Sequence, residues 1–262
     1  MLELRGVAFR GAGFERREHR LLPWMAAVCT IASWELLSQT GVLPALFLPA
    51  PHQVLQALYT LAVSGKLVAH ASASLGRIVA GWLLGSAAGL ALGFAMGIFS
   101  VARALGLSLT AALFPVPKIA LLPLFILWFG LGEPSKIATI AFGVFFPTVV
   151  STYAAVDHVP RNLIAMAQSF GIPARAIVWK VIAPGALPAI LAGFRISSSI
   201  ALILVVAAEM IGAQVGIGAF VLTAGNLMQT DQLLAGVLML SLLGLGVSSL
   251  ISAAERWFLR WR

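Results

Sequence analysis

Charged side chains inside apolar segments are the main candidates for chemistry in this chain. Lys118 stands among Pro115, Pro117 and Pro123, and Arg77 lies within or beside another apolar segment. A cation near the middle of a membrane costs about 2.5–3.5 kcal/mol, so Lys118 requires a wet or paired environment, or a side chain that extends to the membrane surface. Where they face water, both cations favour an anion electrostatically.

Two hydroxyl residues extend this set. Thr148 and Ser198 lie in other apolar segments, and with Lys118 and Arg77 they form a candidate translocation path for a polar solute. Hydroxyl groups in membrane helices also hydrogen-bond and pack against neighbouring helices, and Arg77 can serve such helix pairing too. The sequence leaves both interpretations open for these residues.

No motif in the chain indicates catalysis. The patterns His-Glu-x-x-His and Gly-x-Ser-x-Gly are missing, as is a cluster of Cys and His with metal-ligand spacing. A Walker A loop is missing too, because Gly65-Lys66 is followed by leucine and has no glycine five residues earlier. We therefore expect no catalytic residue, metal or cofactor in this chain, and no ATP hydrolysis by the chain alone.

The composition is that of a membrane protein. Hydrophobic residues make up 60% of the 262 residues and charged residues 10%, against about 25% charged in a soluble domain. Basic residues collect in the cytoplasmic loops of membrane proteins, which explains the net charge of +8 without a nucleic-acid ligand. We expect a multi-pass protein whose surroundings are the lipid bilayer.

Long apolar segments predict an all-α membrane protein with about six transmembrane helices. They cover residues 21–38, 71–98, 104–129, 136–156, 187–211 and 233–252. The first has arginines before it, as a signal peptide does, but it is long enough for a retained helix. The prolines around Lys118 predict that the third is bent or broken.

The remaining doubtful stretch, 42–63, is interrupted by prolines and is interpreted as an external loop and a helix that lies against the bundle. This assignment places twelve basic residues in the inside segments and two in the outside segments, in agreement with the positive-inside rule. It predicts a cytoplasmic segment 1–20, a transmembrane domain 21–252 and a cytoplasmic tail 253–262, with both termini cytoplasmic.

Five glycines recur at a four-residue interval in the second predicted span. In lipid, helices associate by close backbone packing, which small residues at this spacing permit. We expect a packing seam against a neighbouring helix, with a direct role toward substrate as the alternative. The glycines are Gly81, Gly85, Gly89, Gly93 and Gly97.

The loop 157–187 between the fourth and fifth spans contains two short amphipathic patterns. Pro160 can open the first helix, and Gly171 followed by Pro173 can end it. A second short helix is expected from 174 until Pro184. Such helices suit docking into a groove of another protein or contact with the membrane surface. The apolar stripe of the first contains Leu163, Met166, Ala167 and Phe170.

This loop resembles the signature of ABC-importer permeases, which is Glu-Ala-Ala, three residues, Gly, nine residues and Ile-x-Leu-Pro. Residues 165–171 read AMAQSFG and residues 181–184 read VIAP. Further segments in order are similar to the aliphatic sulfonate, taurine and nitrate branch, among them PAPHQV at 49–54, LPLFILWFGLGE at 122–133 and PGALP at 184–188.

The resemblance implies a type I ABC importer permease fold in the inner membrane of a bacterium. The implied partners are a second permease copy in a homodimer, two ATP-binding subunits that carry ATP and magnesium, and an extracytoplasmic solute-binding protein that delivers a small anion. The loop helix implies a coupling role toward the ATPase. Its candidate coupling residues are Ala165, Met166, Ala167, Phe170, Gly171 and Pro173.

Two positions depart from the signature. Ala165 replaces its Glu and Ala183 its Leu, so docking here is expected to depend on apolar burial. A self-contained secondary transporter or channel is the main alternative function, although the two similar halves common in such proteins are not evident. A structural membrane anchor or an intramembrane enzyme is less well supported.

Overall fold

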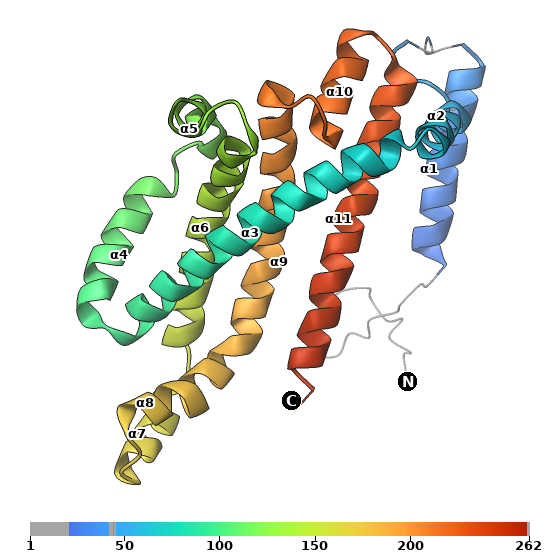
Figure 1. The fold of residues 1–262 in the computed structure, drawn as a ribbon. Helices are drawn as coiled ribbons and strands as arrows, with labels where there is room; N and C mark the ends of the chain where they lie inside the picture. Colours follow the sequence, from blue (N-terminus) through green and yellow to red (C-terminus); the bar gives the residue numbers. More distant parts are fainter. Residues whose placement is uncertain (1–20, 42–43, 45, 261–262) are drawn as a thin grey trace, which may run out of the picture.

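The computed structural model describes residues 21–41, 44 and 46–260, and within them all regular secondary structure is helical (Figure 1). The predicted N-terminal segment 1–20 lies outside the described residues. In chain order the helices are α1 (Leu22–Gln39), α2 (Pro51–Val63), α3 (Lys66–Ile98), α4 (Ser100–Leu113), a 3-10 turn (Lys118–Leu121), α5 (Leu122–Phe129), α6 (Glu133–Asp157), α7 (Arg161–Ser169), α8 (Ala174–Ile177), a π-helical turn (Val178–Ile182), α9 (Ala183–Gly212), α10 (Ile217–Asn226) and α11 (Thr230–Phe258).

Four helices of the described chain are long and apolar enough to cross a membrane. They are α3, α6, α11 and the continuous helix Ala174–Gly212 that contains α8 and α9. Because the bent pair of α4 and α5 can supply a fifth, the count is four or five, where the sequence predicts about six. The predicted span that is missing from this count is α1, whose apolar sequence is interrupted by Glu35 near its end.

The third predicted span, 104–129, is broken as its prolines predict. The helix Ser100–Leu113 and the segment Lys118–Phe129 meet at 88°, with Lys118 at the bend. Figure 1 shows α4 rising from the end of α3 and α5 lying across the opposite end of the bundle.

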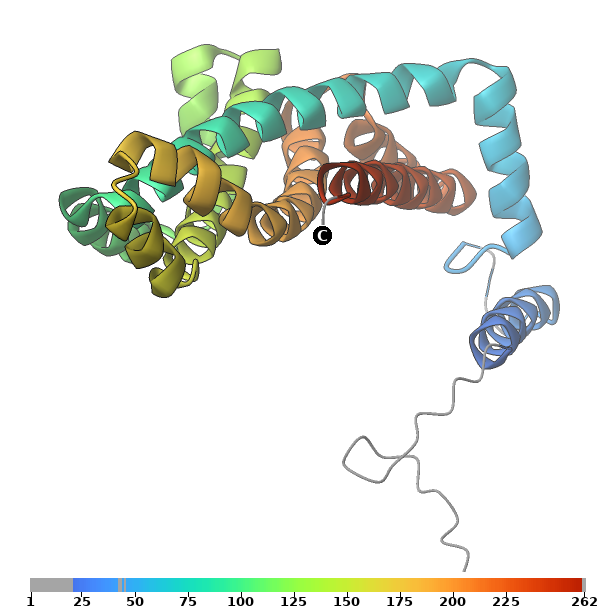
Figure 2. The same ribbon diagram turned by 90° about the horizontal axis from the view of Figure 1, so that it is seen from below.

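The first helix stands apart from the others and is joined to them through α2 (Figure 2). Trp34 of α1 donates a hydrogen bond to the backbone oxygen of Pro49 at 3.1 Å, and Glu35 pairs with His52 at 2.7 Å. The stretch 42–63 therefore contains the predicted helix. It lies against the bundle, where Val54 and Leu61 pack with residues of α10 and α11.

The second expected loop helix is not a separate element. Residues 174–212 form one continuous helix, and Pro184 does not end it. The π-helical turn before it accounts for this, because the N–H of Ala183 donates to the oxygen of Val178, five residues earlier. The wider turn makes room for the proline ring, which would collide with a carbonyl in a regular α-helix.

The glycine row of α3 lies directly against α6. A Cβ on Gly85 would approach the backbone oxygen of Ala141 to 2.3 Å, and one on Gly93 would approach the Thr152 Cβ to 2.6 Å. Gly81, Gly89 and Gly97 are equally close to α6 side chains or backbone. The two helix backbones therefore meet without side chains between them, as in small-residue packing of membrane helices.

Candidate functional site

The helix α7 projects from one end of the bundle, between α6 and the long helix that contains α9 (Figure 1). Pro160 precedes its first residue, where a missing backbone donor costs nothing. On its inner side Ile164 contacts the cluster around Val159 and Ala186. The helix is thus seated on the bundle by one face and open on the other.

Gly171 ends α7 in a left-handed conformation, with φ of +71°. The N–H of Ile172 donates to the oxygen of Ala167 at 3.1 Å, and the N–H of Gly171 donates to the oxygen of Gln168 at 2.9 Å. These two bonds form a Schellman motif, which fixes the angle at which the chain leaves the helix. Pro173 follows in an extended conformation and precedes α8.

The predicted coupling residues divide between the two faces of α7. Phe170 is 77% exposed and Met166 54% exposed, whereas Ala167 is 4% exposed and packs inward. Ala165, Gly171 and Pro173 are exposed. Ala167 therefore anchors the helix to the bundle. The outer apolar surface, here termed the α7 face, consists of Leu163, Met166, Phe170 and Ile172.

Arg77 on α3 lies in a carboxylate network with the start of α6 and the end of α9, and these two helix ends lie opposite α7 in Figure 1. Its Nε and Nη2 atoms donate to the two carboxylate oxygens of Glu133, at 2.6 and 2.7 Å. Its Nη1 donates to Glu209 at 2.6 Å and to the backbone oxygen of Val215 at 2.7 Å. The guanidinium ties α3 to α6, to α9 and to the loop before α10.

Glu209 is 1% exposed and has partners beyond the arginine. The Ser74 hydroxyl lies 2.8 and 2.9 Å from its two oxygens, and the N–H of Gly218 donates to it at 2.8 Å. A Cβ at Gly216 would lie 2.4 Å from its carboxyl carbon. Buried charges require such dense pairing. The structure therefore places Arg77 in helix pairing and not along an open path.

The two hydroxyl candidates are enclosed as well. Thr148 is 1% exposed and Ser198 4% exposed. The Thr148 hydroxyl donates to the Val144 oxygen at 2.9 Å, and the Ser198 hydroxyl donates to the Arg195 oxygen at 2.9 Å, each within its own helix. Neither hydroxyl is free for a solute in this conformation, which agrees with the helix-packing interpretation.

Lys118, one of the four path candidates, borders a cavity. Its ammonium donates hydrogen bonds to the backbone oxygen of Phe114 and, at 3.4 Å, to that of Leu113. It also lies 5.1 Å from the ring centres of Phe114 and Phe146. The cavity has a volume of about 300 Å³. Its walls come from the α4–α5 break, from Gly143 and Pro147 of α6, and from α9.

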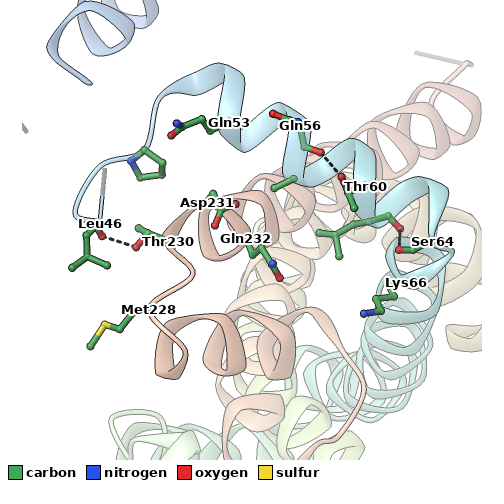
Figure 3. A pocket seen from close by; sticks show the side chains of 13 residues that line it. Leu46, Gln53, Gln56, Thr60, Ser64, Lys66, Met228, Thr230, Asp231 and Gln232 are labelled. Carbon is green, nitrogen blue, oxygen red and sulfur yellow. Dashed lines mark hydrogen bonds between the residues drawn. The ribbon is translucent and has the colours of Figure 1, made fainter. Parts of the chain in front are cut away.

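A second, larger cavity lies at the opposite end of the bundle from α7, between α2 and the start of α11 (Figure 3). Its volume is about 730 Å³. The polar stripe of α2 and the first turn of α11 face it from two sides, and Lys66 closes one end. The stripe consists of Gln53, Gln56, Thr60 and Ser64.

Sequence reasoning missed most of the Arg77 network. It considered Arg77 for helix pairing but gave no role to Ser74, three residues before it, or to Glu133, which lies 56 residues away. It also made no prediction of α10. The available signal in the sequence was the pair of glycines in Gly216-Ile-Gly218. In the structure a Cβ at Gly218 would lie 2.5 Å from the Val206 oxygen, so this position has no space for a side chain.

The fold and these sites define a membrane-spanning permease component. Residues 81–261 match the family described as "Binding-protein-dependent transport system inner membrane component". The chain belongs to this family, which confirms the resemblance seen in the sequence.

The similar proteins are transport permeases. The chain is 36% identical over 242 residues to the permease protein SsuC of Escherichia coli (strain K12), named for aliphatic sulfonate transport, covering 92% of each chain. It is 36% identical to the taurine transport system permease protein TauC of the same organism, covering 90% of this chain and 87% of that protein. An inward facing structure of the MetNI methionine ABC transporter matches with a TM-score of 0.63 at 19% identity, over 76% of this chain and 96% of that one. The expected type I importer fold is confirmed.

Proposed function

We propose that this chain is the permease subunit of an ATP-driven importer that moves a small organic anion of the sulfonate or taurine type into the cytoplasm. A separate ATPase binds the α7 face, and its ATP-driven closure moves the bundle. In this proposal α7 and the C-terminus lie on the cytoplasmic side of the inner membrane, and the N-terminus lies there too only when α1 adds a sixth span. A solute-binding protein delivers the anion on the other side.

The α7 face is the observation that carries this proposal. Four apolar side chains at this end of the bundle are between 38% and 77% exposed, Ile172 the least and Phe170 the most. A short amphipathic helix that shows its apolar face is typical of a helix that docks into a groove on a partner. The basic residues Arg161, Arg175 and Lys180 around it favour the cytoplasmic side.

Membership of the family supports the proposed assembly. A second copy of the chain completes the permease as a homodimer, and two ATP-binding subunits hold ATP and magnesium. Names of the relatives support the substrate class, since SsuC is named for aliphatic sulfonates and TauC for taurine. The signature glutamate is absent at Ala165, so apolar contacts of Phe170 and Met166 carry the docking.

Replacement of Phe170 by alanine tests the coupling role. Loss of a ring that is buried in the partner is expected to cost about 2–4 kcal/mol of the contact. In proteoliposomes with the ATPase and the binding protein, we expect the Phe170→Ala complex to lose anion uptake and substrate-stimulated ATP hydrolysis. Size-exclusion profiles should match those of the wild type, because the Phe170 side chain is 77% exposed.

Phe47→Ala is the matched control, because Phe47 is also exposed, at 74%, and lies between α1 and α2, at the end of the bundle where α11 begins and not at the α7 end. It should keep normal coupling. Substrate-stimulated hydrolysis at the wild-type rate in the Phe170→Ala complex would overturn the coupling assignment. Uptake by the purified chain alone, without an ATPase, would establish the secondary transporter in its place.

A further inference from the structure

Lys118 differs from Arg77 and Arg195, two other basic residues within the predicted spans. Arg77 pairs with Glu133 and Glu209, and Arg195 pairs with Glu255 at 2.6 Å. For Lys118 no carboxylate lies within 4.0 Å among the described residues. Its ammonium is held by carbonyl oxygens and ring faces, which donate electron density but carry no net negative charge.

The depth of Lys118 makes this lack of a counter-charge costly. Its cavity is bounded by Gly143, about 15 Å along α6 from Glu133 at 1.5 Å per residue, in a helix of 25 residues. The ammonium also turns back to the end of α4 instead of extending to a membrane surface. A cation at this depth is typical of a solute or ion pathway.

The remaining wall of the cavity is apolar. Ile200, Ile203, Leu204 and Ala207 of α9 face Val116, Ile119 and Pro147, and no acidic side chain is among the lining residues. A ligand that matches this wall has one anionic end and an aliphatic body. The volume, about 300 Å³, is at the lower end of small-molecule sites.

We propose that this cavity is an intramembrane binding site for an unsubstituted alkanesulfonate, with Lys118 as the residue that selects its charge. This inference rests on the proposed function. The ammonium turns from the carbonyl oxygens at the end of α4 toward the sulfonate oxygens, and the alkyl chain lies against α9. Taurine fits less well, because its own ammonium group would lie against this apolar wall without a carboxylate partner.

Equilibrium dialysis with radiolabelled butanesulfonate tests the site without the binding protein. The probe is measured on the purified complex of the chain with its ATPase subunits. We expect saturable binding by the wild type, at least tenfold weaker binding by Lys118→Met, and binding within about threefold of wild type by Lys118→Arg. Taurine should compete at least tenfold less well than butanesulfonate.

Lys66→Met is the matched control, since it removes a lysine far from the cavity and should leave binding unchanged. Lys118→Gln serves beside Lys118→Met in case one of them assembles poorly. Butanesulfonate binding by both variants at wild-type strength would overturn the role of Lys118, as would absence of saturable binding in the wild type. Equal competition by taurine would overturn the selection for a simple alkyl body.

ATP-driven uptake of butanesulfonate by the reconstituted wild-type complex separates this proposal from the broader one. A complex that binds the probe through Lys118 but takes none up with ATP would contradict the proposed import function and leave the binding site in place. Uptake that is unaffected by Lys118→Met would contradict the site and leave the import function in place.

Discussion

The two faces of α6 differ in how completely they are filled. Toward α3 the helix meets five glycines, and no position in that row has space for a methyl group. Toward α9 and the α4–α5 break it contributes Gly143 and Pro147 to a cavity of about 300 Å³. The same helix thus serves a rigid contact on one side and an open space on the other.

The cations beside these two faces differ in the same way. Arg77 lies beside the filled face and is neutralised by two carboxylates, while Lys118 lies beside the open face and has none within reach in the described chain. Pairing distinguishes a basic residue that joins helices from one that is available to a ligand. Both are cations within predicted apolar segments, so the sequence alone did not separate these two roles.

Removal of Arg77 gives the largest expected effect. Arg77→Met leaves Glu209 buried without its cationic partner, which costs about 3–5 kcal/mol when a buried ion pair is broken. We expect a marked fall in the thermal unfolding temperature of the purified protein in detergent. Lys118→Met removes a charge that has no carboxylate partner and should change stability by less than about 1 kcal/mol.

Equal destabilisation by these two substitutions would break the comparison, because both cations would then be structural. A double-mutant cycle with Glu209→Gln sharpens it. The cost of Arg77→Met should become much smaller once the carboxylate charge is gone.

The packing of α3 on α6 gives the next largest effect. Gly85→Ala brings a methyl group to 2.3 Å from the backbone oxygen of Ala141, which cannot yield as a side chain can. Overpacking of this kind costs about 1–3 kcal/mol. In the same helix Gly76 has no atom within 4 Å of an added Cβ, so Gly76→Ala is the matched control. Urea or thermal unfolding measures both, and a control as unstable as Gly85→Ala would refute the seam.

Periodicity and local breakers made much of the fold predictable. The five glycines indicated a close helix contact, and the prolines around Lys118 indicated the broken span. The Gly171 and Pro173 stop located the end of α7 within a residue or two of Ser169. Each of these features is decided by residues that are near one another in the chain.

The remainder depends on contacts that local patterns do not contain. Arg77 reaches Glu133 and Glu209, 56 and 132 residues away, so its pairing was not evident from the sequence. Pro184 predicted a helix end, but the preceding π-helical turn accommodates it. Ala167 belongs to the apolar stripe of the loop helix, and this suggested that it docks on a partner. In the structure the face of α7 that carries Ala167 packs against the bundle, and the residue is buried.

The open face of α6 gives the smallest effect on stability and the sharpest test of the comparison. In Gly143→Ala the new methyl group would lie 2.0 Å from Cδ1 of Leu204, the end of a flexible side chain that itself lines the cavity. Leu204 can turn into that space, so we expect a loss of less than about 1 kcal/mol, below the cost at Gly85. Because the displaced leucine occupies the cavity, butanesulfonate binding should weaken although the protein remains stable. A loss of stability as large as that of Gly85→Ala would mean that both faces of α6 are equally filled, and Lys118 would then have no space beside it for an anion.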